Sequence, residues 1–250
     1  MSEAEPQFLA TSRHRLAYRK IEGQGPPVVW CGGFGSDMDS TKAQALADWA
    51  AAKGRAYLRF DYSGHGRSEG RFAEGTIGQW YEDAKAAIQA LCTEAPIIVG
   101  SSMGGWIALL VTRALAGTTL APKGLVLIAP AVDFTEELMW AQFPDDIRAQ
   151  IARDGEWKRP SIYGDPLPVT YALIEDGRKH RLFTGPIATH CPVHILQGMQ
   201  DPDVPWKHAM RLVEHLPGDD VTTTLIRDGD HRLSRPQDIE KLLQAVENIV

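Results

Sequence analysis

A serine between two glycines, placed where an apolar run meets a helical pattern, constrains this chain more than any other feature. Gly100-Ser101-Ser102-Met103-Gly104 follows a buried-strand pattern at residues 96–99 and opens a helical pattern over 103–116. This is the G-x-S-x-G arrangement, in which the middle serine sits on a sharp, strained turn and the flanking glycines avoid the neighbouring strands. The start of the helix also places positive dipole near the serine. Ser102 is therefore the predicted nucleophile, and Ser101 fills the other position of the motif.

Strand-like and helix-like runs alternate along the chain. The strand-like runs are short, mostly apolar and bounded by Gly or Pro, at residues 27–31, 56–60, 96–99, 124–129, 192–196 and 221–226. Helical patterns lie between or after them, at residues 42–52, 77–91, 103–116, 205–216 and 236–250. This alternation predicts a single α/β domain over residues 1–250, with a mostly parallel central sheet and helices on both faces.

One interval breaks the alternation. From about residue 133 to 185 there is no convincing strand, and aromatic, charged and helical-looking segments are mixed. A structureless loop of that length is uncommon in a compact domain, so we expect a short helical cap over the carboxyl edge of the sheet. Four of its side chains either line a substrate pocket or pack the cap onto the sheet, namely Met139, Trp140, Phe143 and Tyr163.

A serine hydroxyl needs a base before it can act as a nucleophile. Of the eight histidines, His231 alone lies on a loop just beyond the last strand-like run, so it is the predicted base. Asp201 follows the run at 192–196 and is the predicted orienting acid, which gives the chain order Ser, Asp, His. Asp203 and Asp133 also follow strand-like runs and remain alternative acids.

An acyl-transfer site also needs hydrogen-bond donors aimed at the developing oxyanion. The backbone N–H of Met103, just after the serine, is one expected donor. The N–H of Phe34, in the glycine-rich stretch at 32–36, is the other, although a plain glycine-rich turn is the alternative. Cys31 precedes this stretch and is expected to be a buried, inert thiol. Residues 60–68 lack the Gly-Lys-Ser/Thr of a phosphate loop and are expected to support the site.

Composition excludes several classes of protein. The chain has 26 basic and 32 acidic side chains and no basic stripe, which argues against nucleic acid. No apolar run approaches the ~20 residues of a membrane span. The first residues are acidic and polar, unlike a secretory or transit signal, and the three cysteines are widely spaced; both features favour a cytoplasmic protein without disulfides.

No cofactor is expected. His190 and His194 flank Cys191, but the residues that follow read as a buried strand, so we predict no metal site there. The oligomeric state is left open.

Several longer stretches resemble a known family. They are Gly100-Ser101-Ser102-Met103-Gly104-Gly105-Trp106, Asp201-Pro202-Asp203-Val204-Pro205-Trp206, Thr76-Ile77-Gly78-Gln79-Trp80 and Arg59-Phe60-Asp61-Tyr62-Ser63-Gly64. The chain resembles the α/β-hydrolase superfamily and, within it, the animal mitochondrial family of palmitoyl-protein thioesterases and acyl-glucuronide esterases. That resemblance implies an α/β-hydrolase fold with the nucleophile, acid and base on Ser102, Asp201 and His231. It also implies an oxyanion loop at Gly33-Phe34 and an activity such as depalmitoylation.

Residues and resemblance together predict a serine hydrolase of carboxylic esters or thioesters, in class EC 3.1. The expected substrate is a small-molecule ester, an acylated thiol or an acylated protein. One alternative is a peptidase or C–C bond hydrolase that uses the same three residues. A non-catalytic small-molecule receptor on the same fold is the alternative from another class.

Overall fold

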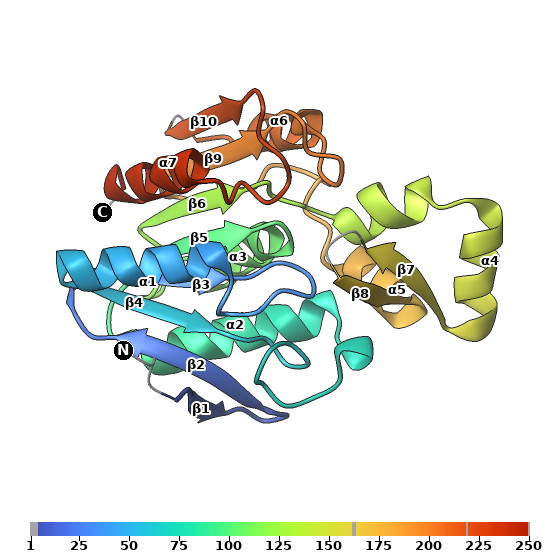
Figure 1. Ribbon diagram of the computed structural model, residues 1–250, viewed down its shortest axis with the longest axis horizontal. Coiled ribbons are helices and arrows are strands. Elements are labelled where there is room, and N and C mark those ends of the chain that lie inside the picture. The colour runs from blue at the N-terminus through green and yellow to red at the C-terminus, as the bar shows by residue number, and fades with distance from the viewer. Residues whose placement is uncertain (1–4, 162–163, 219, 250) are drawn as a thin grey trace.

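The computed structural model describes residues 5–161, 164–218 and 220–249, and its central feature is an eight-stranded sheet (Figure 1). The strands lie in the order β1-β2-β4-β3-β5-β6-β9-β10. Their bounds are β1 Gln7–Ala10, β2 Arg15–Ile21, β3 Gln24–Cys31, β4 Arg55–Phe60, β5 Ile97–Ser101, β6 Gly124–Ile128, β9 Val193–Gly198 and β10 Val221–Ile226. All neighbours from β4 to β10 pair in parallel, so these strands end at one edge of the sheet.

The first two strands form an antiparallel edge that we did not predict from the sequence. β1 pairs with β2, and β2 pairs with β4, both antiparallel. β2 carries two adjacent buried residues, Leu16 and Ala17, while its later residues are half-buried. It therefore lacks the alternation of apolar and polar residues that reveals a half-exposed strand.

Helices cover both faces of the sheet, as predicted. α1 (Thr41–Lys53) and α7 (Pro236–Glu247) pack on one face, and α2 (Ile77–Leu91), α3 (Met103–Leu115) and α6 (Trp206–His215) on the other (Figure 1). α2 is capped by Thr76, whose Oγ1 accepts from the Gln79 N–H at 3.3 Å. α3 is buried along nearly all its length, which fits its place behind the centre of the sheet.

The insertion lies between β6 and β9 and extends beyond the sheet's carboxyl edge (Figure 1). It holds the expected helices, α4 (Asp145–Asp154) and α5 (Tyr171–Lys179), together with single turns of π-helix at Thr135–Met139 and 3₁₀-helix at Trp140–Gln142. The expectation that it contains no strand is wrong. β7 (Glu156–Ser161) and β8 (Gly164–Thr170) form an antiparallel hairpin that pairs only with itself. Three prolines in these strands, Pro160, Pro166 and Pro168, hide the strand pattern because proline cannot donate to a ladder.

Asp133 joins the two ends of the insertion. It lies just after β6, with a fully buried side chain and φ of 55°. Its carboxylate accepts from the Leu182 N–H at 2.8 Å and from the Phe183 N–H at 3.0 Å. The chain therefore leaves and re-enters the sheet domain at nearly the same point.

Within the described residues, no helix combines the length and apolar character needed to cross a membrane.

Candidate active site

Ser102 forms the turn between β5 and α3. β5 ends at Ser101 and α3 begins at Met103, so the turn consists of this one residue. Its backbone has φ 54° and ψ −118°, a conformation that residues with a side chain rarely adopt. The Ser102 N–H donates to Ile128 O at 2.8 Å, and the Ala131 N–H donates to Ser102 O at 3.0 Å. These bonds to β6 and the loop after it hold the strained turn in place.

The two glycines of the motif allow backbones to approach closely. A Cβ on Gly104 would lie 2.0 Å from Cys31 O, and a Cβ on Gly100 would lie 2.4 Å from Gly104 O. Both distances are impossible for real atoms, so β3, β5 and α3 can pack as they do only with glycine here. Burial raises the pKa of the neighbouring Cys31 to about 12, so its thiol is protonated and unreactive at neutral pH.

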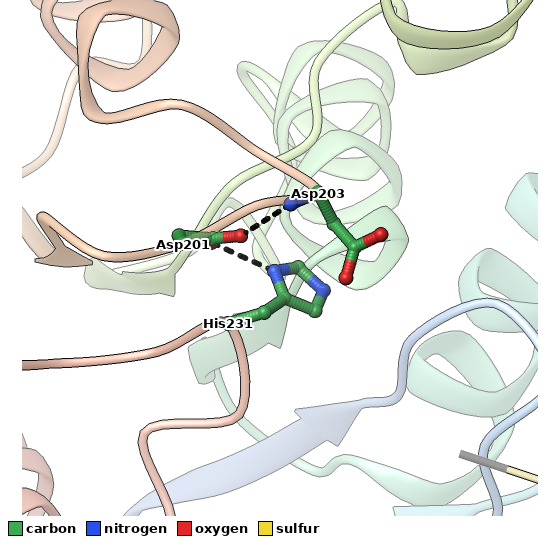
Figure 2. Close-up of side chains that lie close together, drawn as sticks. All are labelled: Asp201, Asp203 and His231. Atoms are coloured by element: carbon green, nitrogen blue, oxygen red, sulfur yellow. Dashed lines mark hydrogen bonds and ion pairs between the residues drawn. The ribbon is translucent and has the colours of Figure 1, made fainter. Parts of the chain in front are cut away.

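Side chains from three strand ends meet at Ser102. His231, after β10, donates through Nδ1 to Asp201 Oδ2 at 2.8 Å, and Asp201 follows β9 (Figure 2). His231 Nε2 lies 3.1 Å from Ser102 Oγ. Because a carboxylate only accepts hydrogen bonds, Nδ1 carries the proton and the Nε2 lone pair faces the serine hydroxyl. This geometry suits removal of the Ser102 proton.

Asp201 is fixed by its other hydrogen bonds. Its Oδ1 accepts from the N–H groups of Asp203 and Val204, both at 2.8 Å. Its Oδ2 also accepts from Gln197 Nε2 at 3.3 Å. Gln197 is fully buried on β9 and was not predicted as part of the site. The signal that could have revealed it is a polar residue near the end of an otherwise apolar strand.

The two alternative acids have other contacts. Asp133 binds the backbone of the insertion's far end, as described above. Asp203 makes an ion pair with Arg159 of β7, with Nη2 and Oδ1 3.6 Å apart, and its carboxylate lies beside the His231 ring (Figure 2). The acid position of the hydrogen-bonded chain is occupied by Asp201.

Three of these residues carry groups that can bind a metal ion. Ligand atoms of Asp201, Asp203 and His231 all lie within 4.8 Å of one another. However, both Asp201 oxygens and His231 Nδ1 are engaged in the hydrogen bonds given above. The cluster therefore suits a hydrogen-bonded triad better than a cation site.

The predicted oxyanion loop lies against Ser102. A Cβ on Gly33 would be 3.4 Å from Ser102 Cβ, so the loop after β3 passes directly beside the serine. Phe34 and Met103 both line the cavity into which Ser102 opens. The residues that carry the two expected donors are thus next to Ser102.

This cavity has a volume of about 390 Å³, which is within the ~300–1,000 Å³ range of small-molecule sites. Ser102 and His231 lie in its wall. Much of the remaining wall is apolar and comes from both the insertion and the sheet's loops, including Phe134, Leu138, Met139, Leu167 and Val204. The ion-paired side chains of Arg159 and Asp203 form a charged part of the wall. The cavity therefore offers an apolar compartment and a charged edge beside one serine.

Of the four pocket residues expected from the sequence, Met139 lines this cavity. Trp140 packs instead against the Tyr171 ring and the Arg178 guanidinium. Phe143 packs against Trp157, with ring centroids 5.2 Å apart. Tyr163 lies outside the described residues. Leu167 was missed because it lies on the unpredicted hairpin.

The nucleophile turn, the strand order and the capped sheet edge define an α/β hydrolase. The chain belongs to the alpha/beta hydrolase family, whose model matches residues 28–242. Within that family, it is 33% identical to "Palmitoyl-protein thioesterase ABHD10, mitochondrial" from Bos taurus over 264 aligned residues, which cover 100% of this chain and 85% of the relative. The human protein of the same name is 34% identical and covers 94% of this chain and 76% of its own length.

Solved structures agree with this placement. Alpha/beta hydrolase domain-containing protein 10 from mouse superposes with a TM-score of 0.89 at 32% identity, covering 98% of both chains. A putative hydrolase from Agrobacterium vitis S4 superposes with a TM-score of 0.94 at 46% identity, covering 99% of this chain and 98% of its own. The resemblance to the mitochondrial palmitoyl-protein thioesterases and the predicted fold are both confirmed.

The names of the curated relatives conflict with the cytoplasmic prediction for this chain. Those relatives are named as mitochondrial proteins. The compartment of this chain therefore stays a prediction.

Proposed function

We propose that this hydrolase cleaves carboxylic esters or thioesters through an acyl-enzyme on Ser102. The observation that carries the proposal is the continuous chain from Asp201 through His231 to Ser102 Oγ, with steps of 2.8 and 3.1 Å, at the wall of an apolar cavity. The curated relatives named as thioesterases support an acyl-thiol or related substrate for this chain.

Each residue has a distinct part in the proposed reaction. His231 takes the proton of Ser102 Oγ while that oxygen attacks the acyl carbonyl. The Phe34 and Met103 N–H groups stabilise the oxyanion, and Asp201 holds the imidazole in the tautomer that accepts at Nε2. His231 then protonates the departing alcohol or thiol, and water hydrolyses the acyl-enzyme by the same route.

The apolar cavity supports an acyl chain as the bound group. An acyl tail beside Phe134 and Leu138 would leave water, while the leaving group would face the charged edge at Arg159 and Asp203. Rates across a series of nitrophenyl esters should depend strongly on acyl length. Equal rates for all lengths would count against an acyl pocket in this cavity.

Two adjacent serines provide a matched test of the nucleophile. Ser102→Ala should lower kcat for nitrophenyl butyrate by ~10⁴-fold or more and abolish labelling by a fluorophosphonate probe. Ser101→Ala changes the same chemical group one residue earlier and should keep both activities. A Ser102→Ala variant that still turns over the ester at the original rate would refute the proposal. Comparing nitrophenyl esters with thioesters of matched acyl length in the wild type then decides which class is preferred.

A further inference from the structure

The oxyanion loop needs support because it has no regular secondary structure of its own. Residues 32–40 connect β3 to α1, and Phe34 and Gly35 occupy the centre of a turn closed by a 3.1 Å bond from the Ser36 N–H to Gly33 O. Gly35 has φ of +72°, in the left-handed region. An N–H donor on such a turn can be aimed accurately only if the surrounding structure fixes its peptide planes.

Three buried polar side chains at and beyond the end of β4 provide that support. Asp61 Oδ1 accepts from the Met38 N–H at 2.7 Å, and Arg59 Nη1 donates to Met38 O at 3.0 Å. His65 Nε2 accepts from the Gly35 N–H at 3.2 Å. None of the three residues is more than 3% exposed. Of the three, His65 is bonded to the peptide that directly follows the proposed donor residue, Phe34.

The contacts of His65 define a single tautomer. Its Nδ1 lies 3.3 Å from Ser63 O, which can only accept, so Nδ1 carries the proton. Its Nε2 faces the Gly35 N–H, which can only donate, so Nε2 carries the lone pair. Burial lowers the pKa of His65 to about 4, which keeps the ring neutral at neutral pH and leaves this acceptor intact.

The same aromatic rings hold His65 and Phe34. The His65 ring packs edge-on against Phe72 and Trp80, with centroids 4.9 and 5.0 Å apart. The Phe34 ring packs edge-on against those two rings at 4.9 and 5.8 Å. A phenylalanine at 65 could fill this space equally well. The contacts of His65 with Ser63 O and with the Gly35 N–H are what a phenylalanine could not make.

We propose that His65 is a positioning residue for the oxyanion hole: by accepting from the Gly35 N–H, it fixes the Phe34–Gly35 peptide and so aims the Phe34 N–H at the acyl oxygen. This inference rests on the proposed function, because it requires an oxyanion. Losing one oxyanion donor typically costs ~10²–10³ in rate. Loosening a donor that is still present should cost less, about 10- to 100-fold in kcat. KM should change little, because the negative charge develops in the transition state.

Two polar substitutions separate this role from simple packing. In His65→Gln, the side-chain oxygen can reach the position of Nε2 and accept from Gly35. In His65→Asn, the shorter amide reaches the position of Nδ1, so it can keep the Ser63 contact but not the Gly35 contact. Both variants lose the aromatic ring and should be destabilised alike. His194→Asn is the control for loss of a histidine elsewhere, because His194 lies on β9 and is bonded to Thr224.

The readouts are kcat and KM for nitrophenyl butyrate and the affinity of an aryl boronic acid, which forms a tetrahedral anion on the nucleophile. We expect His65→Asn to lower kcat 10- to 100-fold, to weaken boronate binding by a similar factor and to leave KM within twofold. His65→Gln should recover most of this loss, and His194→Asn should resemble the wild type. Equal kcat and boronate affinity in the two His65 variants would overturn the inference.

A second measurement does not depend on the variants folding. In ¹⁵N-labelled wild type, the His65 ring should show a protonated Nδ1 and an unprotonated Nε2 at neutral pH. The opposite tautomer would overturn the inference. An active wild type with indistinguishable His65→Asn and His65→Gln variants would refute this inference alone. A wild type that neither turns over ester nor reacts with fluorophosphonate would refute the proposed function as well.

Discussion

Replacing Asp133 by alanine should destabilise the protein without removing its chemistry. Two buried N–H groups, those of Leu182 and Phe183, would lose their acceptor. Each unsatisfied buried donor costs about 1–3 kcal/mol. Alanine is also disfavoured at φ 55° by about 1 kcal/mol. Burial raises the pKa of Asp133, which means that its charged form is disfavoured in the folded protein. Removing this carboxylate therefore offsets part of the destabilisation. We therefore expect the free energy of unfolding to fall by about 2–5 kcal/mol.

Thermal and urea unfolding would measure this loss. For a chain of this size, it corresponds to a decrease in Tm of roughly 5–15 °C. Asp133→Asn should lose less, because asparagine tolerates the left-handed conformation and keeps one acceptor oxygen. Ester hydrolysis by Asp133→Ala, assayed well below its Tm, should stay within a few-fold of the wild type.

Asp201→Asn is the matched comparison, because both aspartates follow a strand of the same sheet. It should lower kcat by ~10⁴-fold through the wrong histidine tautomer, with a much smaller change in Tm. The reasoning would be refuted if Asp133→Ala kept the wild-type Tm and lost as much kcat as Asp201→Asn. That result would make Asp133 the catalytic acid.

Two further predictions concern residues that support the site from behind its lining. Gly104→Ala should lower the free energy of unfolding by about 3 kcal/mol or more and reduce activity, because the new Cβ would lie 2.0 Å from the backbone atom Cys31 O. Gly185→Ala is the control, because its new Cβ would meet open space and the variant should unfold like the wild type. Equal urea midpoints for the two variants would contradict this packing argument. His65 has a folded-state pKa of about 4 against an ordinary 6.5, so the unfolded chain takes up its proton first as the pH falls. The free energy of unfolding of the wild type should therefore fall by about 3 kcal/mol through this residue between pH 6.5 and 4. His65→Gln should not show this part of the pH dependence, because glutamine does not titrate. Urea unfolding of both proteins at pH 7 and pH 4.5 would test this, and identical pH dependence would refute it.

The parts of the molecule that the sequence predicts are those with strong local signals. The glycines around Ser102 are required by contacts within one strand–turn–helix unit, so the motif is visible in a few residues. Asp201 and His231 could be proposed because parallel strands end at one edge, which makes the position after each strand informative. The structure places the His231 ring within hydrogen-bonding distance of both the Asp201 carboxylate and the Ser102 hydroxyl.

The parts that were missed depend on contacts between distant segments. The β7–β8 hairpin contains three prolines and pairs only with itself, so no local periodicity reveals it. The cavity wall includes Leu138 and Leu167, which lie in different elements of the insertion and line one cavity only in the folded protein. The role of Asp133 was ambiguous for the same reason, because its partners Leu182 and Phe183 are about fifty residues away along the chain.

The junction at Asp133 also bears on how such a protein can diversify. Because the insertion begins and ends at one hydrogen-bonded point, a replacement segment of another length needs only to meet the same junction. It would bring new cavity walls in place of Leu138, Arg159 and Leu167. The loops that carry Ser102, Asp201 and His231 lie outside the exchanged segment and would keep their places. Under the proposed function, the reaction and the choice of acyl group would then be set by separate parts of the chain. A graft of the insertion from a relative is expected to transfer substrate preference while leaving the geometry of Ser102, Asp201 and His231 unchanged.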